Sequence, residues 1–149
     1  MTGSEPSRSG RVLAVDLGSK RIGLALSDPS RTIASPLTMI ERSRSSAADH
    51  DAIAAVVAEH DVALVVVGLP KSLSGAEGPA ARAARTEIAA IAERLGERCP
   101  VVAHDERLTT VSAHRALRDG NVKGRDRRDK VDKVAAAVLL QHFLEGNVR

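Results

Sequence analysis

Short apolar runs alternate with polar, glycine-containing turns along much of the chain. Runs rich in Val, Leu and Ile that end at Gly, Asp or Ser are typical of β-strands, and two of them joined by a short glycine turn predict an antiparallel hairpin. A run that is apolar at every position predicts a strand covered on both faces. Five strands are therefore expected, at Arg11–Leu17, Arg21–Asp28, Ser35–Ile40, Val62–Val67 and Pro100–His104.

Other segments repeat their apolar residues at helical spacing. Pro79 occupies the place of a first helical residue, and the last segment is apolar on most faces, which predicts a deeply packed helix. Three leading strands followed by alternating helices and strands predict an α/β fold with a mixed sheet and helices on both faces. The expected helices are Ser46–His60, Pro79–Gly96, a helix from Thr109 or Thr110 to Arg118, and about Asp129–Glu145.

Length and composition favour one globular domain, and the net charge permits a polyanionic partner. The chain has 149 residues, and we expect a disordered lead-in over residues 1–10 and a single domain over 11–149. Pro36 restricts the third strand to an edge position or a strand start. With one Phe and no Tyr or Trp, the chain lacks the aromatic platforms of many single-strand binders. The net charge of +3 permits a nucleic acid partner without requiring one.

The chain carries a single cysteine, Cys99, which cannot form an internal disulfide and fits a reducing compartment. Its position before Pro100 predicts a small buried residue, with a regulatory thiol as the alternative. The N-terminal segment lacks the apolar core of a signal peptide, and no run approaches the length of a membrane span. The expectation is a cytoplasmic protein without a membrane partner.

Three carboxylates occupy positions that the backbone would hold rigidly. Asp16 lies at the end of the first strand, Glu106 follows the fifth strand, and Asp132 is expected in the first turn of the last helix. Functional groups of open α/β sheets gather at the carboxyl ends of the strands. Clustered carboxylates suit a hard cation such as Mg²⁺ or Mn²⁺, and a pair of such ions can clamp a phosphodiester during hydrolysis.

Each acid also has a structural interpretation. The structural alternatives are that Asp16 only closes a strand, that Glu106 pairs with a neighbouring cation, and that Asp132 interacts with the helix dipole. Asp105 and Asp129 compete with their neighbours for the same roles. From spacing alone, the set indicates metal-dependent phosphoryl chemistry only as one of these alternatives.

A basic segment precedes Asp132, with five cations against two acids between Lys123 and Lys130. We expect residues 121–130 to form a mobile polar loop, which is either a solvated surface or a binding site for nucleic-acid phosphates. His104, beside Asp105, either assists the site or is a hydrogen-bonded strand-end histidine. The candidate nucleic-acid-binding residues are Lys20, Arg21, Arg107, Lys123, Arg125, Arg127, Arg128 and Lys130.

Four segments together resemble one family. VDLGSKRIGLALSDP, VVVGLPKSLSGAEGPAA, DERLTTVSA and VDKVAAAVLLQHFL, in this order, are similar to the YqgF family, also called RuvX or RuvC-like. The similarity covers nearly all of residues 11–145. The DLGS turn by itself also occurs in actin-like kinases, but those need two such domains and several hundred residues. Small departures are Ser19 in place of the commoner Thr and Ser72 in place of a frequent Asn.

The resemblance implies a ribonuclease H-like fold with a five-stranded sheet in the order 3-2-1-4-5, the first three strands antiparallel. It implies a metal-dependent endonuclease that matures the 5′ end of pre-16S rRNA, acting on structured RNA or on ribosomal precursor particles. Asp16 would then bridge two Mg²⁺ or Mn²⁺ ions, with Glu106 and Asp132 completing the ligands. The alternatives are a Holliday junction resolvase acting on branched DNA and a non-catalytic nucleic-acid-binding module, and the chain could be a monomer or a homodimer.

Overall fold

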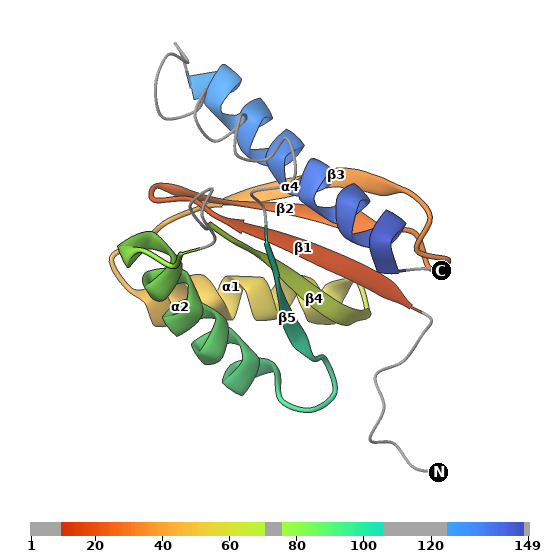
Figure 1. Ribbon diagram of the computed structural model, residues 1–149, viewed down its shortest axis with the longest axis horizontal. Coiled ribbons are helices and arrows are strands. Elements are labelled where there is room, and N and C mark those ends of the chain that lie inside the picture. Colours follow the sequence, from red (N-terminus) through yellow and green to blue (C-terminus); the bar gives the residue numbers. More distant parts are fainter. Residues whose placement is uncertain (1–9, 71–75, 106–124, 148–149) are drawn as a thin grey trace.

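The computed structural model describes residues 10–70, 76–105 and 125–147, with the side chains of the last segment described from Val134 to Gly146. Its strands form one five-stranded sheet in the order β3-β2-β1-β4-β5 (Figure 1). β1, β2 and β3 pair antiparallel, whereas β4 runs parallel to β1 and β5 parallel to β4. The expected mixed sheet and its strand order are confirmed. The strands are β1 (Arg11–Leu17), β2 (Arg21–Ser27), β3 (Ala34–Glu41), β4 (Val62–Leu69) and β5 (Val101–Asp105).

Helices cover both faces of the sheet, as predicted. α1 (Ser46–Glu59) and α2 (Pro79–Leu95) pack on one face, and α4 (Arg125–Asn147) packs on the other (Figure 1). α1 begins where Ser45 accepts a hydrogen bond from the backbone N–H of Ala48, an N-cap that satisfies a free helix donor. Two buried clusters of aliphatic side chains therefore hold the sheet between the helical layers.

In the central strands, successive side chains lie alternately on the two faces of the sheet. In β1, Leu13 and Val15 belong to the cluster under α1 and α2, whereas Val12 and Ala14 belong to the cluster under α4. Successive side chains of a strand point to opposite faces. Asp16 is therefore on the face that α4 covers.

β3 forms one edge of the sheet, which is the position that Pro36 predicts. Pro36 pairs with Ala25, and the β2–β3 register shifts between Leu24 and Ala25. Proline has no N–H to donate to a ladder, so an edge with a local irregularity accommodates it.

The start of α4 corrects the sequence interpretation. The helix begins at Arg125 rather than at Asp129, so residues 125–130 are helical and not part of a loop. Arg and Lys are good helix formers, and acid–base spacings such as Asp126 to Lys130 favour a helix as soon as Gly124 has been passed. Asp132 consequently lies beyond the first turn, where the helix dipole has little effect, and its dipole interpretation is wrong. The helix expected from Thr109 or Thr110 to Arg118 lies outside the described residues.

Gly10, which the sequence interpretation placed in the lead-in, is hydrogen-bonded to the turn after β2. Its N–H donates to the carbonyl of Pro29 at 3.3 Å, and its carbonyl accepts from Nε of Arg31 at 2.8 Å. Its φ of +100° and a would-be Cβ only 2.9 Å from Cβ of Ala63 both require glycine. Gly10 therefore belongs to the folded domain rather than to the lead-in.

Cys99 is buried in the cluster under α1 and α2, with 4% of its surface exposed. Burial raises the pKa of its thiol. Both observations favour the small buried residue over the regulatory thiol. Among the helices that the structure describes, none is long and apolar enough to cross a membrane.

Candidate active site

Asp16 is the next-to-last residue of the central strand β1 and is fully buried. It pairs with Gly23 of β2. On the other side, Val15 pairs with Val67 of β4, so the next position of β4 is Gly68. A glycine therefore stands beside Asp16 on each neighbouring strand, so neither of the two directly adjacent positions carries a side chain.

Of the other two candidate ligands, Asp132 belongs to α4, and Glu106 comes directly after the last described residue of β5. β5 ends at Asp105, which pairs with Leu69 of β4, and Glu106 is the next residue of the chain. In α4, Asp132 precedes the buried residues Ala135 and Ala136 by three and four positions, which places it on the helix face toward the sheet. Of the three candidate ligands, the structure thus places Asp16 in β1 and Asp132 in α4, both on the α4 side of the sheet.

Side-chain geometry of this set is described only for Asp16. Glu106 lies outside the described residues, and for Asp132 the structure describes its place in the helix. Among the side chains that the structure describes, no three His, Cys, Asp or Glu residues form a group that could hold a metal. If Glu106 and Asp132 join the buried carboxylate of Asp16, as the sequence predicts, the donor set would fit Mg²⁺ or Mn²⁺, which prefer oxygen ligands.

The two cations of the β1–β2 turn have different surroundings. Lys20 is exposed in the turn. Arg21 begins β2, its side chain is 11% exposed, and its Nε lies 3.9 Å from Oε1 of Glu41. Since Arg21 is two residues from Gly23, it lies on the face of Asp16 as a diagonal neighbour, a relation of roughly 7–8 Å between adjacent strands. The exposed Lys20 can therefore contact a partner from solution. Arg21 lies close enough to act electrostatically on the carboxylate of Asp16.

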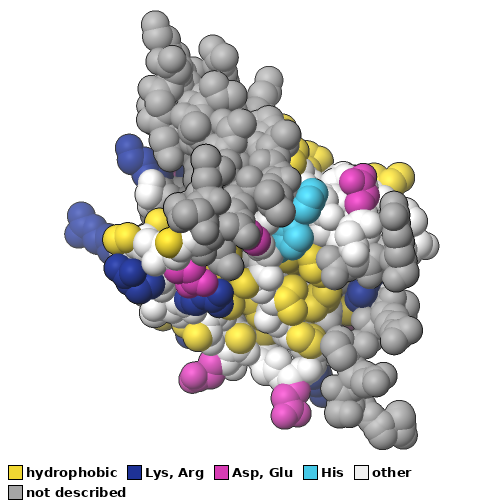
Figure 2. All heavy atoms as spheres, in the orientation of Figure 1, with side chains coloured by type: hydrophobic (Ala, Val, Ile, Leu, Met, Phe, Trp, Pro, Cys, Tyr) yellow, Lys and Arg dark blue, Asp and Glu magenta, His cyan; other side chains and the backbone are white. Residues whose placement is uncertain are grey.

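The remaining candidate cations fall on α4 or outside the described residues. Arg127 and Lys130 precede Val134 by seven and four positions, and Val134 is 38% exposed, so these two positions are on the outer side of α4. Figure 2 shows further Lys and Arg side chains along the left of that view, where Figure 1 places the tip of the β1–β2 hairpin and the start of α2. Arg125 and Arg128 are also in α4, whereas Arg107 and Lys123 are outside the described residues.

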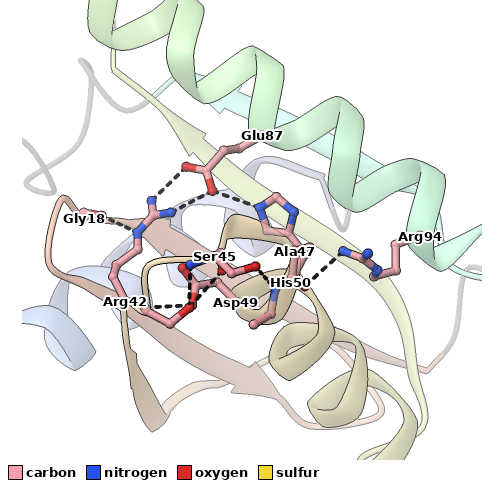
Figure 3. A network of polar contacts seen from close by, with 10 residues as sticks. Gly18, Arg42, Ser45, Ala47, Asp49, His50, Glu87 and Arg94 are labelled. Carbon is pink, nitrogen blue, oxygen red and sulfur yellow. Dashed lines mark hydrogen bonds and ion pairs between the residues drawn. The ribbon is translucent and has the colours of Figure 1, made fainter.

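A network that the sequence did not predict ties the turn after Asp16 to both helices of the other face (Figure 3). Nη1 and Nη2 of Arg42 each donate to a carboxylate oxygen of Glu87 at 2.8 Å, and its Nε donates to the carbonyl of Gly18 at 3.0 Å. Nε2 of His50 lies 2.9 Å from Oε2 of the same Glu87. The backbone N–H of Arg42 donates to the carbonyl of Lys20 at 2.8 Å. Arg42 therefore fixes the turn from two directions.

Electrostatics within this network favour the charged forms. Burial, the largest effect on Glu87, raises its pKa, but the hydrogen bonds and positive charges of Arg42 and His50 together hold that pKa below its ordinary value. The hydrogen bonds that Arg42 donates to Glu87 raise the pKa of Arg42 against the opposing effect of burial. Arg42 and Glu87 are 45 residues apart, so no local spacing in the sequence could have indicated the pair.

His104 is a hydrogen-bonded strand-end histidine, which confirms its structural interpretation. Its Nε2 lies 2.8 Å from Nδ1 of His142 in α4, and the ring of Phe143 meets it edge-on with centroids 5.6 Å apart. Burial lowers the pKa of His104, as does His142, while Asp105 opposes the shift. The contact joins the strand that leads to Glu106 to the helix that carries Asp132.

The fold is the ribonuclease H-like fold of RuvC resolvases. RuvC from Thermus thermophilus superimposes with a TM-score of 0.54 at 16% identity, covering 91% of this chain and 95% of that one. A second structure, T. thermophilus RuvC in complex with a Holliday junction substrate, gives a TM-score of 0.53 at 16% identity over 92% of this chain and 94% of that one. Such identities establish the fold alone.

Sequence comparison identifies the family. The model of the RuvX family, described as Holliday junction resolvase, matches residues 10–146, and the chain belongs to this family. A protein of Thermobifida fusca named "Putative pre-16S rRNA nuclease" is 49% identical over 145 residues, covering 93% of this chain and 89% of that protein. A relative of the same name from Frankia casuarinae is 45% identical over 133 residues, covering 89% of this chain and 65% of that protein, just under two thirds of its length.

Proposed function

We propose that this protein is a metal-dependent endonuclease that cleaves structured RNA, with the 5′ region of pre-16S rRNA as its substrate. The observation that carries the proposal is the fully buried Asp16 at the carboxyl edge of the central strand, between Gly23 and Gly68. The names of the relatives support the choice of RNA. A substrate of this kind would place the protein in the cytoplasm and on ribosomal precursor particles.

In this proposal Asp16, Glu106 and Asp132 hold two Mg²⁺ or Mn²⁺ ions. When bound, the ions activate a water for attack on phosphorus and neutralise the charge that develops on the phosphate. The protein's own contribution is to exclude bulk water from Asp16, since its side chain is fully buried. Lys20 and the outer positions of α4 would hold phosphates on either side of the cut.

The test in cells is to deplete the protein and sequence the 5′ ends of 16S rRNA, with rescue by wild type, Asp16→Asn or Asp51→Asn. Asp51 is 70% exposed on α1 and pairs with Arg94, so its substitution is a matched change of an aspartate outside the site. Extended 5′ ends should persist with Asp16→Asn and disappear with Asp51→Asn. Normal 5′ ends under depletion, or full rescue by Asp16→Asn, would reject the proposal.

The family description and the RuvC fold favour one second candidate, a Holliday junction resolvase. A resolvase would act as a symmetric dimer on four-way DNA. Paired symmetric nicks in a synthetic junction, in the absence of RNA cleavage, would support that function instead. A non-catalytic nucleic-acid-binding module would bind RNA without cutting it, and Asp16→Asn would then leave every activity unchanged.

A further inference from the structure

A cleft of about 340 Å³ lies between the β1–β2 turn, the end of β4 and the first half of α2. Leu17 and Gly18, which follow Asp16 directly, line it together with Gly68 at the end of β4. Exposed alanines of α2, Ala80 and Ala83, line it as well. Its volume is at the lower end of the roughly 300–1,000 Å³ that is typical of small-ligand pockets, so it can take one nucleotide-sized group and no duplex.

The Arg42–Glu87 pair also lines this cleft and gives it one polar, directional edge. Arg42 uses three of its five N–H donors on Gly18 and Glu87, which leaves two. Oε2 of Glu87 accepts from both Arg42 and His50, whereas Oε1 accepts one bond from Arg42 and keeps a second acceptor position. The two side chains are 18% and 20% exposed, so these donors and this acceptor can be reached.

We infer that this cleft binds one unpaired nucleobase of the RNA strand, in a nucleotide next to the one that is cut. The inference rests on the proposed function and names a subsite within it. A neighbouring donor and acceptor are complementary to the hydrogen-bonding edge of a base. In a duplex that edge is occupied by the pairing partner, so the cleft selects a nucleotide that is unpaired or extruded.

The apolar walls of the cleft can pack against a nucleobase, as aromatic rings do in other nucleic-acid-binding proteins. Leu17, Pro70 and the alanines of α2 give the cleft an apolar lining against which a base can pack. Arg42 is already held by the carbonyl of Gly18 in the β1–β2 turn, and Glu87 by His50 of α1. Because both side chains are ordered before a base binds, binding costs less conformational entropy. Since Leu17 follows Asp16 without a gap, the base site and the candidate metal site share the carboxyl end of β1.

The test fills the cleft from its exposed wall. Ala83→Leu places a branched side chain in the cleft without touching the core, and Ala89→Leu makes the same change on the exposed surface of α2 outside the cleft lining. Both are made in the Asp16→Asn background, so that binding is measured without cleavage. The probe is a single-stranded RNA from the 5′ region of pre-16S rRNA, intact or with one base removed at each position in turn, followed by fluorescence anisotropy at fixed salt.

With the Ala89→Leu control, removal of one particular base should weaken binding by roughly tenfold, the scale of a single stacked base. Ala83→Leu should bind the intact RNA about as weakly as that abasic RNA and should lose the sensitivity to that position. Ala80→Leu, which fills the cleft from the first turn of α2, should repeat the result if Ala83→Leu folds poorly.

Equal binding of intact RNA by the Ala83→Leu and Ala89→Leu proteins would overturn the inference while leaving the nuclease proposal in place. An abasic series with no distinctive position would do the same. If the control bound none of these RNAs and wild type cleaved none, the proposed function itself would fail.

Discussion

Replacing Glu87 with Gln tests whether the network behind the β1–β2 turn stabilises the fold. The carboxylate of Glu87 accepts two hydrogen bonds from Arg42 and contacts His50, and so joins α2 to α1 and to the β3–α1 loop. Glutamine keeps the shape of the side chain but removes its charge and turns an NH₂ group toward cationic donors. The Glu87→Gln variant therefore leaves Arg42 without its charged partner.

The size of the effect follows from burial. Hydrogen bonds to charged groups contribute roughly 1.5–3 kcal/mol, and loss of one partner from a fully buried pair costs about 3–5 kcal/mol. Glu87 and Arg42 are 20% and 18% exposed, so solvent screens part of the interaction. We expect the free energy of unfolding to fall by about 2 kcal/mol, which corresponds to roughly 4–8 °C in Tm for a protein of this size.

The same interaction has a defined pH dependence. The pKa of Glu87 is lower in the folded protein than its ordinary value of 4.5. A carboxylate with a lowered pKa stabilises the fold above its unfolded pKa, and this contribution is lost as the pH falls through the folded pKa. The difference in unfolding free energy between wild type and Glu87→Gln should be constant from about pH 7 to 5 and shrink below pH 4.5.

Urea unfolding of both proteins at several pH values measures these quantities. Glu77→Gln is the matched control, since Glu77, just before α2, binds Arg85 of α2 through two 2.6 Å contacts, but Arg85 is 52% exposed. Surface pairs of that kind contribute little, so the control should lose clearly less stability than Glu87→Gln. Equal losses in the two variants, or a Glu87→Gln difference that persists unchanged into acid, would refute this account of the network.

Three further predictions concern α4 and the core. Arg127→Ala and Lys130→Ala should each reduce the slope of log affinity for RNA against log salt by about one unit per lost phosphate contact, and an unchanged slope would exclude them from the interface. Leu139→Ala, in the buried face of α4, should lower the free energy of unfolding by about 2–5 kcal/mol, measured in urea. Val134→Ala on the exposed side should change it by less than about 0.5 kcal/mol, and similar losses at both positions would contradict the packing of α4. Cys99 should react with a thiol reagent far faster in the unfolded than in the native protein, and rapid native reaction would contradict its burial.

The strands and most helix limits could be predicted because local signals mark them. β1 has the predicted limits, and β5 differs from its prediction by one residue at each end. Pro36 correctly indicated an edge strand, since a missing N–H restricts it wherever it occurs. The start of α4 was wrong because the density of charge over residues 125–130 was interpreted as a loop, although Arg and Lys also favour helices.

The contacts that organise the site could not be predicted from local patterns. Arg42 and Glu87 are 45 residues apart, and His104 and His142 are 38 apart. Pairs of this kind exist only once the sheet brings the β1–β2 turn close to α1 and α2 on one face and His104 of β5 close to α4 on the other. The two glycines beside Asp16 are a similar case, because only the strand register shows that they flank it.

The central claim is that Asp16 belongs to a metal-dependent RNA-cleaving site. The most direct test incubates the purified protein with the 5′ region of pre-16S rRNA, with Mg²⁺, with Mn²⁺ and with chelator. Wild type and Asp51→Asn should cleave the RNA only with the metal, and Asp16→Asn should lose more than the roughly 10–100-fold in rate that loss of an outer-shell partner costs. Cleavage by folded Asp16→Asn at the wild-type rate, or cleavage that chelator leaves unchanged, would contradict the account.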